Sequence, residues 1–194
     1  MKKQLTKLAL TSALVAGAFM PTAYAADYII DTKGAHASIN FKIQHLGYSW
    51  LVGRFDKFGG TFSYDAENIA ASKIAVNIDT SSINSNHAER DKHLKSDDFL
   101  DVSAFTNATF VSDSVTDQGE GKLAIAGTLS LHGVSKKIVI DAQKVGEGKD
   151  PWGGYRVGFS GSTSIALTDF AIKMNLGPAS NNVQLNLYIE GIKQ

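Results

Sequence analysis

Cysteine is absent from this chain of 194 residues. Its absence excludes thiolate nucleophiles, Cys-ligated zinc, iron–sulfur clusters and covalent attachment of c-type haem. An oxidising compartment permits disulfides but does not require them, and a chain of this length can fold around a core without them. The lack of cysteine therefore limits the chemistry and leaves the compartment open.

Familiar catalytic motifs are also lacking. Residues 26–194 contain no GxSxG, HExxH, Walker A or GxGxxG pattern. His87-Ala88-Glu89 resembles the start of a deaminase signature, but the rest of that signature requires cysteines. His87 and His93 lie six positions apart, so a helix would not place them on one face. We expect no catalytic residue and no metal site.

The chain has no excess of positive charge, since 19 basic residues balance 19 acidic ones. A nucleic-acid-binding protein usually carries a basic patch. If the N-terminal leader considered next is removed, three lysines leave with it and the remaining chain becomes slightly acidic. The charge balance therefore argues against a nucleic-acid partner.

Residues 1–25 have the three parts of a secretory signal peptide. Three lysines (Lys2, Lys3 and Lys7) precede an apolar stretch over residues 8–20, and Ala23-Tyr24-Ala25 supplies a small-x-small cleavage site. The apolar stretch is too short to cross a bilayer as a helix, and no second long one follows. We expect residues 1–25 to be cleaved and residues 26–194 to form one domain in the periplasm of a Gram-negative bacterium. The alternative is an N-terminal anchor that is never cut.

Alternation of apolar and polar residues with period two dominates the rest of the chain. The apolar rows cover residues 37–45, 58–64, 74–78, 108–115, 123–131, 138–142, 157–167 and 183–189. Clusters of turn-forming residues separate these rows. Long strands with one apolar face are typical of antiparallel sheets. About eight of them with short connections predict an all-β fold, either a closed barrel or a tight sandwich.

One segment breaks the alternation. Asn86 followed three positions later by Glu89 matches a capping box and predicts a short helix through about Lys95. The expected anchors of this insertion on the barrel are Leu94, Phe99, Leu100 and Phe105. The segment is interpreted either as a lid over one barrel end or as a fixed plug.

Five glycines lie in phase with the apolar rows: Gly53, Gly60, Gly127, Gly161 and Gly191. Inward glycines let a barrel strand bend, and they also leave volume that a larger side chain would fill. An eight-stranded barrel is just wide enough for its own side chains or for one ligand. The glycines therefore favour an internal cavity.

The side chains predicted to line that cavity are aliphatic and aromatic, which favours a long hydrocarbon over a sugar or nucleotide. The candidate ligand-binding residues are Phe41, Ile43, His45, Phe55, Phe62, Val76, Ile78, Leu94, Phe99, Phe110, Leu129, Phe159, Phe170 and Leu187. His45 is the polar member, at the end of an apolar row. It is interpreted either as a hydrogen-bonded core histidine or as a contact to a polar head group.

The chain resembles the YceI family over essentially all of residues 27–194. The resemblance rests on residues 31–59, with His45-Leu46-Gly47-Tyr48-Ser49-Trp50, on 86–94 with Asp98-Phe99-Leu100, on 108–110, on 129–134, on Asp150-Pro151-Trp152-Gly153-Gly154 and on 169–180. It implies an eight-stranded, lipocalin-like antiparallel barrel with one short inserted helix. It also implies a periplasmic protein that encloses a long isoprenoid chain, such as a polyprenyl quinone or polyprenyl lipid.

The family supplies no catalytic residues, so the resemblance implies a binding protein without a cofactor, its isoprenoid lipid or quinone being a ligand. Transport, storage and stress response are the roles that it suggests, and a transient membrane contact and a homodimer stay open as partners. An enzyme acting on an isoprenoid lipid is the main alternative, with His45 as its one candidate group. An outer-membrane barrel is a weaker alternative, because lysines such as Lys42 and Lys137 would lie on its strands.

The cleavage site generates the first prediction. The mature protein should begin at Ala26-Asp27-Tyr28, because the small-x-small site ends at Ala25. Intact-mass measurement of protein released from the periplasm by osmotic shock checks this. Recovery of protein that retains residues 1–25 would contradict it.

Overall fold

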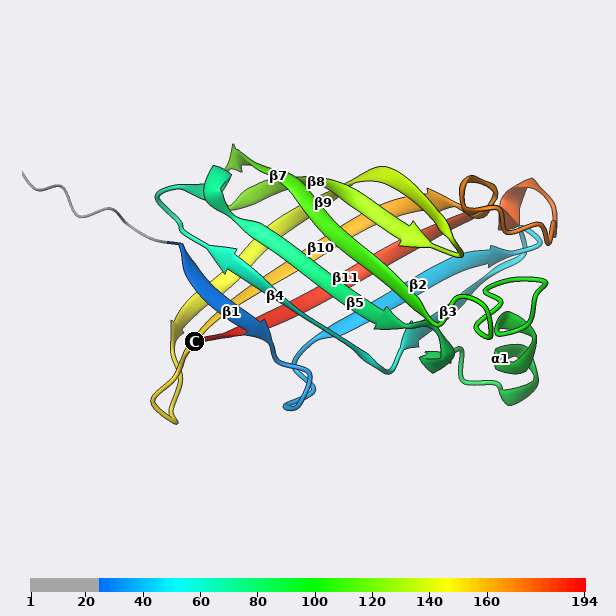
Figure 1. The fold of residues 1–194 in the computed structure, drawn as a ribbon, viewed down its shortest axis with the longest axis horizontal. Helices are drawn as coiled ribbons and strands as arrows, with labels where there is room; N and C mark the ends of the chain where they lie inside the picture. Colours follow the sequence, from blue (N-terminus) through cyan, green and yellow to red (C-terminus); the bar gives the residue numbers. More distant parts are fainter. Residues whose placement is uncertain (1–24) are drawn as a thin grey trace, which may run out of the picture.

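The computed structural model describes residues 25–194, so the predicted signal peptide, apart from Ala25, lies outside the described residues. Within this range the fold is all-β, with a single short α-helix (Figure 1). The strands are β1 (Ala26–Ile30), β2 (Ser38–His45), β3 (Ser49–Phe55), β4 (Phe58–Tyr64), β5 (Lys73–Asp79), β6 (Ile83–Asn84), β7 (Asn107–Gly119), β8 (Lys122–Leu131), β9 (Val134–Lys149), β10 (Tyr155–Ala166) and β11 (Asn182–Lys193). The helical elements are α1 (Ala88–Leu94) and the 3-10 turns η1 (Ile69–Ala71), η2 (Thr80–Ser82), η3 (Leu167–Phe170) and η4 (Pro178–Ser180).

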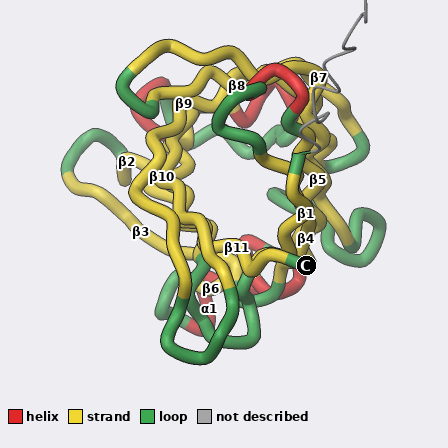
Figure 2. The backbone as a smooth tube through the Cα atoms, turned by 90° about the vertical axis from the view of Figure 1, so that its left-hand side faces the viewer, coloured by secondary structure: helices red, strands yellow, loops and turns green. Residues whose placement is uncertain are grey.

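Eight of the strands close into an antiparallel barrel in the order β1-β4-β5-β7-β8-β9-β10-β11. Pairing of β1 with β11 completes the ring, with Tyr28 opposite Lys193 and Ile30 opposite Gly191. Figure 2 shows the ring from one end. The predicted eight-stranded antiparallel barrel is therefore confirmed.

Strand β11 pairs with neighbouring strands along both of its edges. One edge pairs with β10 from Asn182 to Ile192. The other edge is shared, because β2 pairs with residues 183–188 and β1 with residues 191–193. Strands β3 and β6 continue the sheet outward from β2. β1 and β2 thus pair with successive parts of the same edge of β11, and the segment between them connects the two.

The predicted apolar rows correspond to β2, β4, β5 and β7 through β11. Strands β1, β3 and β6 were not predicted. β1 has five residues and β6 has two, which is too short for a clear alternation. In β3 the outward residues Trp50 and Val52 are themselves apolar and exposed, and only the next outward residue, Arg54, is polar, so the alternation is weak.

The inserted helix forms where predicted, but its cap differs. His87 is the N-cap, and its Nδ1 accepts a hydrogen bond from the Arg90 backbone N–H at 3.2 Å. Asn86 instead takes a left-handed backbone conformation, with φ of 60°. The chain therefore turns at Asn86, and the helix begins one residue later than the capping-box pattern implies.

A buried ionic cluster ties the segment after β1 to the wall. Arg156 on β10 donates from Nη1 to Asp31 at 2.7 Å and to Glu190 at 2.5 Å, and from Nε to Asp150 at 2.8 Å. The Asp31 carboxylate is 5 % exposed and also accepts from the Gly34 backbone N–H at 2.8 Å. These bonds join β1, β10, β11 and the β9–β10 turn.

The cluster lowers the pKa of Asp31. The hydrogen bond from Arg156 is the main reason why the pKa of Asp31 falls from 3.8 to about 2, with smaller contributions from Gly34 and His36. The same contacts raise the pKa of Arg156, chiefly through Asp31. The folded state therefore prefers Asp31 ionised.

Acid titration of stability tests the cluster. A carboxyl whose pKa is lower in the folded state stabilises the fold above its unfolded-state pKa, and this contribution is lost as the pH falls toward the folded-state value. The unfolding free energy of the wild type should therefore fall more steeply between pH 4 and pH 2 than that of Asp31→Asn, as measured by urea denaturation at several pH values.

Asp113→Asn is the matched control, because Asp113 forms an exposed ion pair with Lys137 at 2.6 Å. Exposed pairs contribute about 0–1 kcal/mol, so the control should keep the wild-type slope. Parallel curves for the wild type and Asp31→Asn would contradict the role of the cluster.

Candidate functional site

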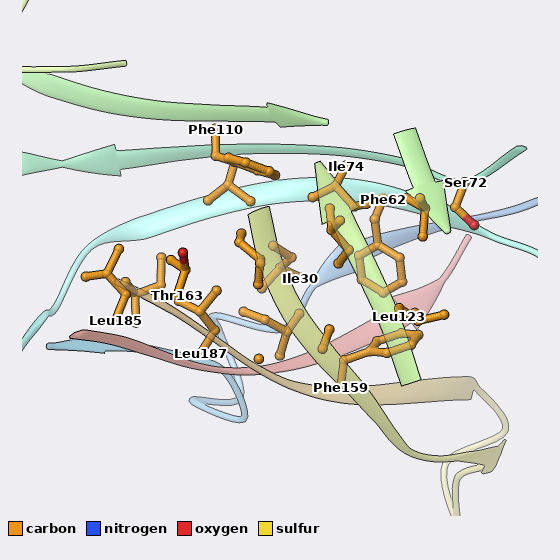
Figure 3. A pocket seen from close by; sticks show the side chains of 18 of the residues that line it. Ile30, Phe62, Ser72, Ile74, Phe110, Leu123, Phe159, Thr163, Leu185 and Leu187 are labelled. Carbon is orange, nitrogen blue, oxygen red and sulfur yellow. The ribbon is translucent and has the colours of Figure 1, made fainter. Parts of the chain in front are cut away.

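The barrel encloses a cavity of about 140 Å³ (Figure 3). Residues from all eight barrel strands and from β2 line it, and most of them are isoleucine, leucine, valine and phenylalanine. Period-two alternation turns one face of every strand inward, so the lining combines contributions from strands far apart in the chain. The site is a property of the closed barrel, and no short motif contains it.

Oxygen-bearing side chains are few in this lining, and none of the lining residues is charged. Ser63 Oγ accepts a hydrogen bond from the Lys73 backbone N–H at 3.1 Å, and Thr163 Oγ1 donates to the Val139 carbonyl at 2.8 Å. Ser72 is buried, and its hydroxyl has no partner among the described residues. Such a cavity favours a ligand that is almost wholly apolar.

Seven of the residues proposed from the sequence line the cavity: Phe62, Val76, Ile78, Phe110, Leu129, Phe159 and Leu187. Six others lie outside it, in the core cluster or packed against it: Phe41, Ile43, Phe55, Leu94, Phe99 and Phe170. Several of these share the inward face with the lining residues but lie nearer the α1 end, where side chains fill the barrel. Alternation identifies a face and does not identify a level along the barrel axis.

His45 lies outside both the core and the cavity. It is the last residue of β2, and its side chain is exposed. It pairs with Ser49 in the last register position before the β2–β3 turn. The interpretation of His45 as a core histidine is therefore wrong, and the head-group contact stays a prediction, with His45 outside the cavity lining.

The insertion after β6 closes one end of the barrel. Phe99 and Leu100 are buried in the main core cluster together with Phe170, which is 1 % exposed, and Leu94 packs against this cluster. No residue of α1 or of the segment up to β7 lines the cavity. This packing favours the plug interpretation over the lid.

Several lining residues were missed by the sequence-based selection. Ile125, Ile140, Leu185 and Ile189 lie in apolar rows that alternation had already identified, so that signal was sufficient to find them. Ser72 follows the η1 turn, outside any row, and no sequence pattern marks it.

The inward glycines accommodate aromatic rings. A side chain at Gly127 would meet the Phe110 ring at 2.5 Å, one at Gly53 would collide with Phe41, and one at Gly191 with Phe62. Of the five predicted glycines, Gly161 alone lines the cavity. The volume left by Gly53, Gly127 and Gly191 is therefore filled by phenylalanine, and its interpretation as ligand space is wrong there.

Three potential metal ligands, Asp31, His36 and Glu190, approach one another within 4.8 Å. The guanidinium of Arg156 already bonds Asp31 at 2.7 Å and Glu190 at 2.5 Å. A fixed cation thus supplies the positive charge that a metal ion would bring. We interpret this group as a structural ion cluster.

Comparison with known proteins identifies the family. The family model described as YceI-like domain matches residues 28–191. The chain belongs to the YceI family. A "UPF0312 protein" of Shewanella denitrificans is 60 % identical over 195 residues, with full coverage of both chains.

Solved structures share the barrel. The YCEI protein of Campylobacter jejuni superimposes with a TM-score of 0.71 at 26 % identity, covering 95 % of this chain and 99 % of that one. A polyisoprenoid binding domain from Saccharophagus degradans implicated in plant cell wall breakdown superimposes with a TM-score of 0.64 at 16 % identity, covering 88 % of this chain and 100 % of that one. In the described range of this YceI-family chain, no helix is both long and apolar enough to cross a membrane.

The seating of rings on glycines generates a stability prediction. Gly127→Ala should lower the unfolding free energy by about 1–3 kcal/mol, because the new methyl group would collide with the Phe110 ring and with the Val111 carbonyl. Urea denaturation measures the change. Gly59→Ala is the matched control, since a side chain there meets nothing within 4 Å, and it should stay within about 0.5 kcal/mol of the wild type. Equal stability of the two variants would show that Phe110 does not need the glycine.

Proposed function

We propose that this YceI-family protein binds an isoprenoid lipid inside its barrel and acts as a periplasmic carrier or reservoir for it. The uncharged, apolar cavity carries the proposal. A polyisoprenoid binding domain with the same fold supports the choice of ligand class. Methyl-branched isoprene units match the shape of a lining rich in isoleucine, leucine and valine, and each buried CH₂ contributes about 0.8 kcal/mol.

The size of the cavity constrains how such a ligand is held. An apolar cavity of about 150 Å³ admits a molecule the size of benzene. The 140 Å³ found here therefore holds only a short part of a long isoprenoid. A longer chain requires lining side chains to move, or part of the chain to extend beyond the cavity. Phe110 lines the cavity and also belongs to the main core cluster, so movement of its ring is one way to lengthen the cavity.

The predicted signal peptide supports the periplasmic location, and so does the enclosed apolar site, which suits transfer of a lipid through water. An isoprenoid lipid is nearly insoluble in water, so moving one between two membranes requires an enclosed apolar site. Exchange with a membrane also requires a transient contact. Trp152, 78 % exposed in the β9–β10 turn, is a suitable contact residue, because tryptophan favours the membrane–water interface.

Catalysis on the ligand is less well supported than binding. Acid–base chemistry needs a titratable group within hydrogen-bond reach of the substrate. Among the described lining residues, the tyrosine Tyr64 is the one titratable group, and the earlier candidate His45 lies outside the cavity. The geometry therefore supports a binding protein.

Ligand identification tests the proposal directly. Protein purified from the periplasm of its own host should carry an isoprenoid, detectable by native mass spectrometry and by organic extraction. Ile125→Trp fills the middle of the cavity and should lower the ligand content at least tenfold while circular dichroism shows a folded barrel.

Val139→Trp is the matched control, because Val139 is exposed on the neighbouring strand β9. This variant should keep the wild-type ligand content. Wild-type protein without any isoprenoid, or a folded Ile125→Trp variant with full ligand content, would contradict the proposal.

A further inference from the structure

The β2–β3 hairpin carries a group of exposed apolar side chains, which we call the hairpin patch: Leu46, Tyr48, Trp50 and Val52. Each of the four is between 48 % and 87 % exposed. Trp50 and Val52 share the outward face of β3, and Leu46 and Tyr48 lie at the turn. Contiguous apolar side chains on a water-exposed surface indicate contact with a partner.

The turn of the hairpin holds Leu46 in a conformation that leucine rarely adopts. The Tyr48 backbone N–H donates to the His45 carbonyl at 2.9 Å, and the central residues Leu46 and Gly47 have φ of 53° and 84°. Positive φ at both positions is typical of a type I′ turn, which favours asparagine or aspartate where Leu46 stands. Because the Leu46 side chain is exposed, packing within the protein does not explain leucine at this position.

The hairpin is anchored at its base. Ser180 in η4 is buried, and its Oγ donates to the Gln44 carbonyl at 2.8 Å and accepts from the Leu46 backbone N–H at 3.1 Å. Lys42 Nζ lies over the Trp50 ring, 4.6 Å from its centroid. Figure 1 shows the end of β2 beside the segment that precedes β11, at the α1 end of the barrel. A patch on such a fixed hairpin loses little conformational entropy when it docks.

The surroundings of the patch are free of acidic residues in sequence. Residues 32–55, which include β2 and β3, contain no aspartate or glutamate, and neither do residues 170–189, which include η4. Lys42 and Lys173, one in each range, form no ion pair with any residue between 25 and 194. The patch therefore combines apolar side chains with positive charge that an anionic partner can neutralise.

We infer that the hairpin patch docks the protein on a membrane that contains anionic phospholipids. The inference rests on the proposed function, because a lipid carrier must meet a membrane. Tryptophan and tyrosine favour the head-group level of a bilayer, and lysines beside them are attracted to its negative surface. A second copy of this chain is a less suitable occupant, because pairing two patches would bring like charges together.

The backbone of β3 limits the depth of docking. On its outer edge β3 pairs with β6 only at Arg54 and Phe55, so residues 49–53 have no strand partner there in the described range. Unpaired backbone groups do not enter the hydrocarbon of a bilayer, so the hairpin rests among the head groups. On the inward face of β3, Leu51 and Phe55 pack against the main core cluster. Docking thus places the membrane beside core that must move if a longer ligand enters at this end.

The two tryptophans of the chain allow the hairpin and the β9–β10 turn to be read separately. In mature protein, Trp152→Phe leaves Trp50 as the reporter, and Trp50→Phe leaves Trp152. With vesicles of phosphatidylglycerol and phosphatidylethanolamine, Trp50 emission should shift to the blue. Lipids brominated on their acyl chains should quench Trp50 at least about twofold more than Trp152. Equal or stronger quenching of Trp152 would overturn the inference.

Co-flotation with the same vesicles measures the affinity. Tyr48→Ser combined with Trp50→Ser should lower the partition coefficient at least about tenfold. Lys42→Gln should lower it about fivefold, and should leave binding to phosphatidylcholine vesicles unchanged. The matched controls are Tyr188→Ser, an exposed tyrosine on β11, and Lys137→Gln, a lysine paired with an acid on the barrel wall. Both controls should keep the wild-type value.

Leu46→Asn separates docking from folding. Asparagine suits the turn, so the thermal unfolding midpoint should stay unchanged or rise. The partition coefficient should nevertheless fall about threefold or more, because an apolar side chain of the patch is lost. A lower midpoint, or an unchanged partition coefficient, would contradict the role assigned to Leu46.

The outcomes separate the inference from the proposed function. If the wild type binds neither kind of vesicle, the docking surface is wrong, while the isoprenoid content of the purified protein still decides the proposed function. If the patch variants keep vesicle binding but change the oligomeric state in size-exclusion chromatography, the patch is an interface between copies and the inference is overturned. If they lose vesicle binding and the purified wild type carries no isoprenoid, the docking surface stands and the proposed function fails.

Discussion

Pairing between β1 and β11 is the interaction on which the remaining structure depends, because it turns an open sheet into a closed ring. Closure gives the backbone groups of both strands partners along the seam and separates an inner from an outer face. The inner face of every strand then becomes part of one dry interior. Asp31, Arg156 and Glu190 reinforce this seam, since they join the end of β1 to β10 and β11.

The interior holds packed core clusters and a cavity, and many side chains belong to both. Toward α1, Phe99, Leu100 and Phe170 fill the barrel as a core. Away from α1, Phe159 on β10 contacts Phe62 and Tyr64 on β4, although β1 and β11 separate these strands in the ring. The lining residues leave a cavity of about 140 Å³. Phe110, whose ring packs on Gly127, belongs both to the core cluster and to the cavity lining. A ring that packs on an inward glycine occupies the space that a side chain at that position would fill. Small rotations of such a ring would therefore change the length of the cavity.

Charge is arranged to keep the cavity neutral. Ion pairs of this fold, such as those of Lys137 and Lys144, lie outside the lining and hold their charges against partners. A neutral interior selects ligands by shape and apolar area. A carrier must release its ligand again, and release from such a cavity breaks no strong ionic contact. Selection of this kind therefore suits the proposed carrier role.

The sequence by itself determined the class of fold, the strand faces and the position of the inserted helix, because these depend on local periodicity and turn chemistry. It also determined seven lining residues, from Phe62 to Leu187, and could have found Ile125 and Leu185 by the same alternation. Only the tertiary structure decided which inward residues face the cavity and which pack as core, as Phe41 and Phe170 do. It alone decided that Phe110 fills the space at Gly127, that His45 is exposed, and that Ser72 lacks a partner. These features depend on contacts between strands distant in the chain, which no local pattern encodes.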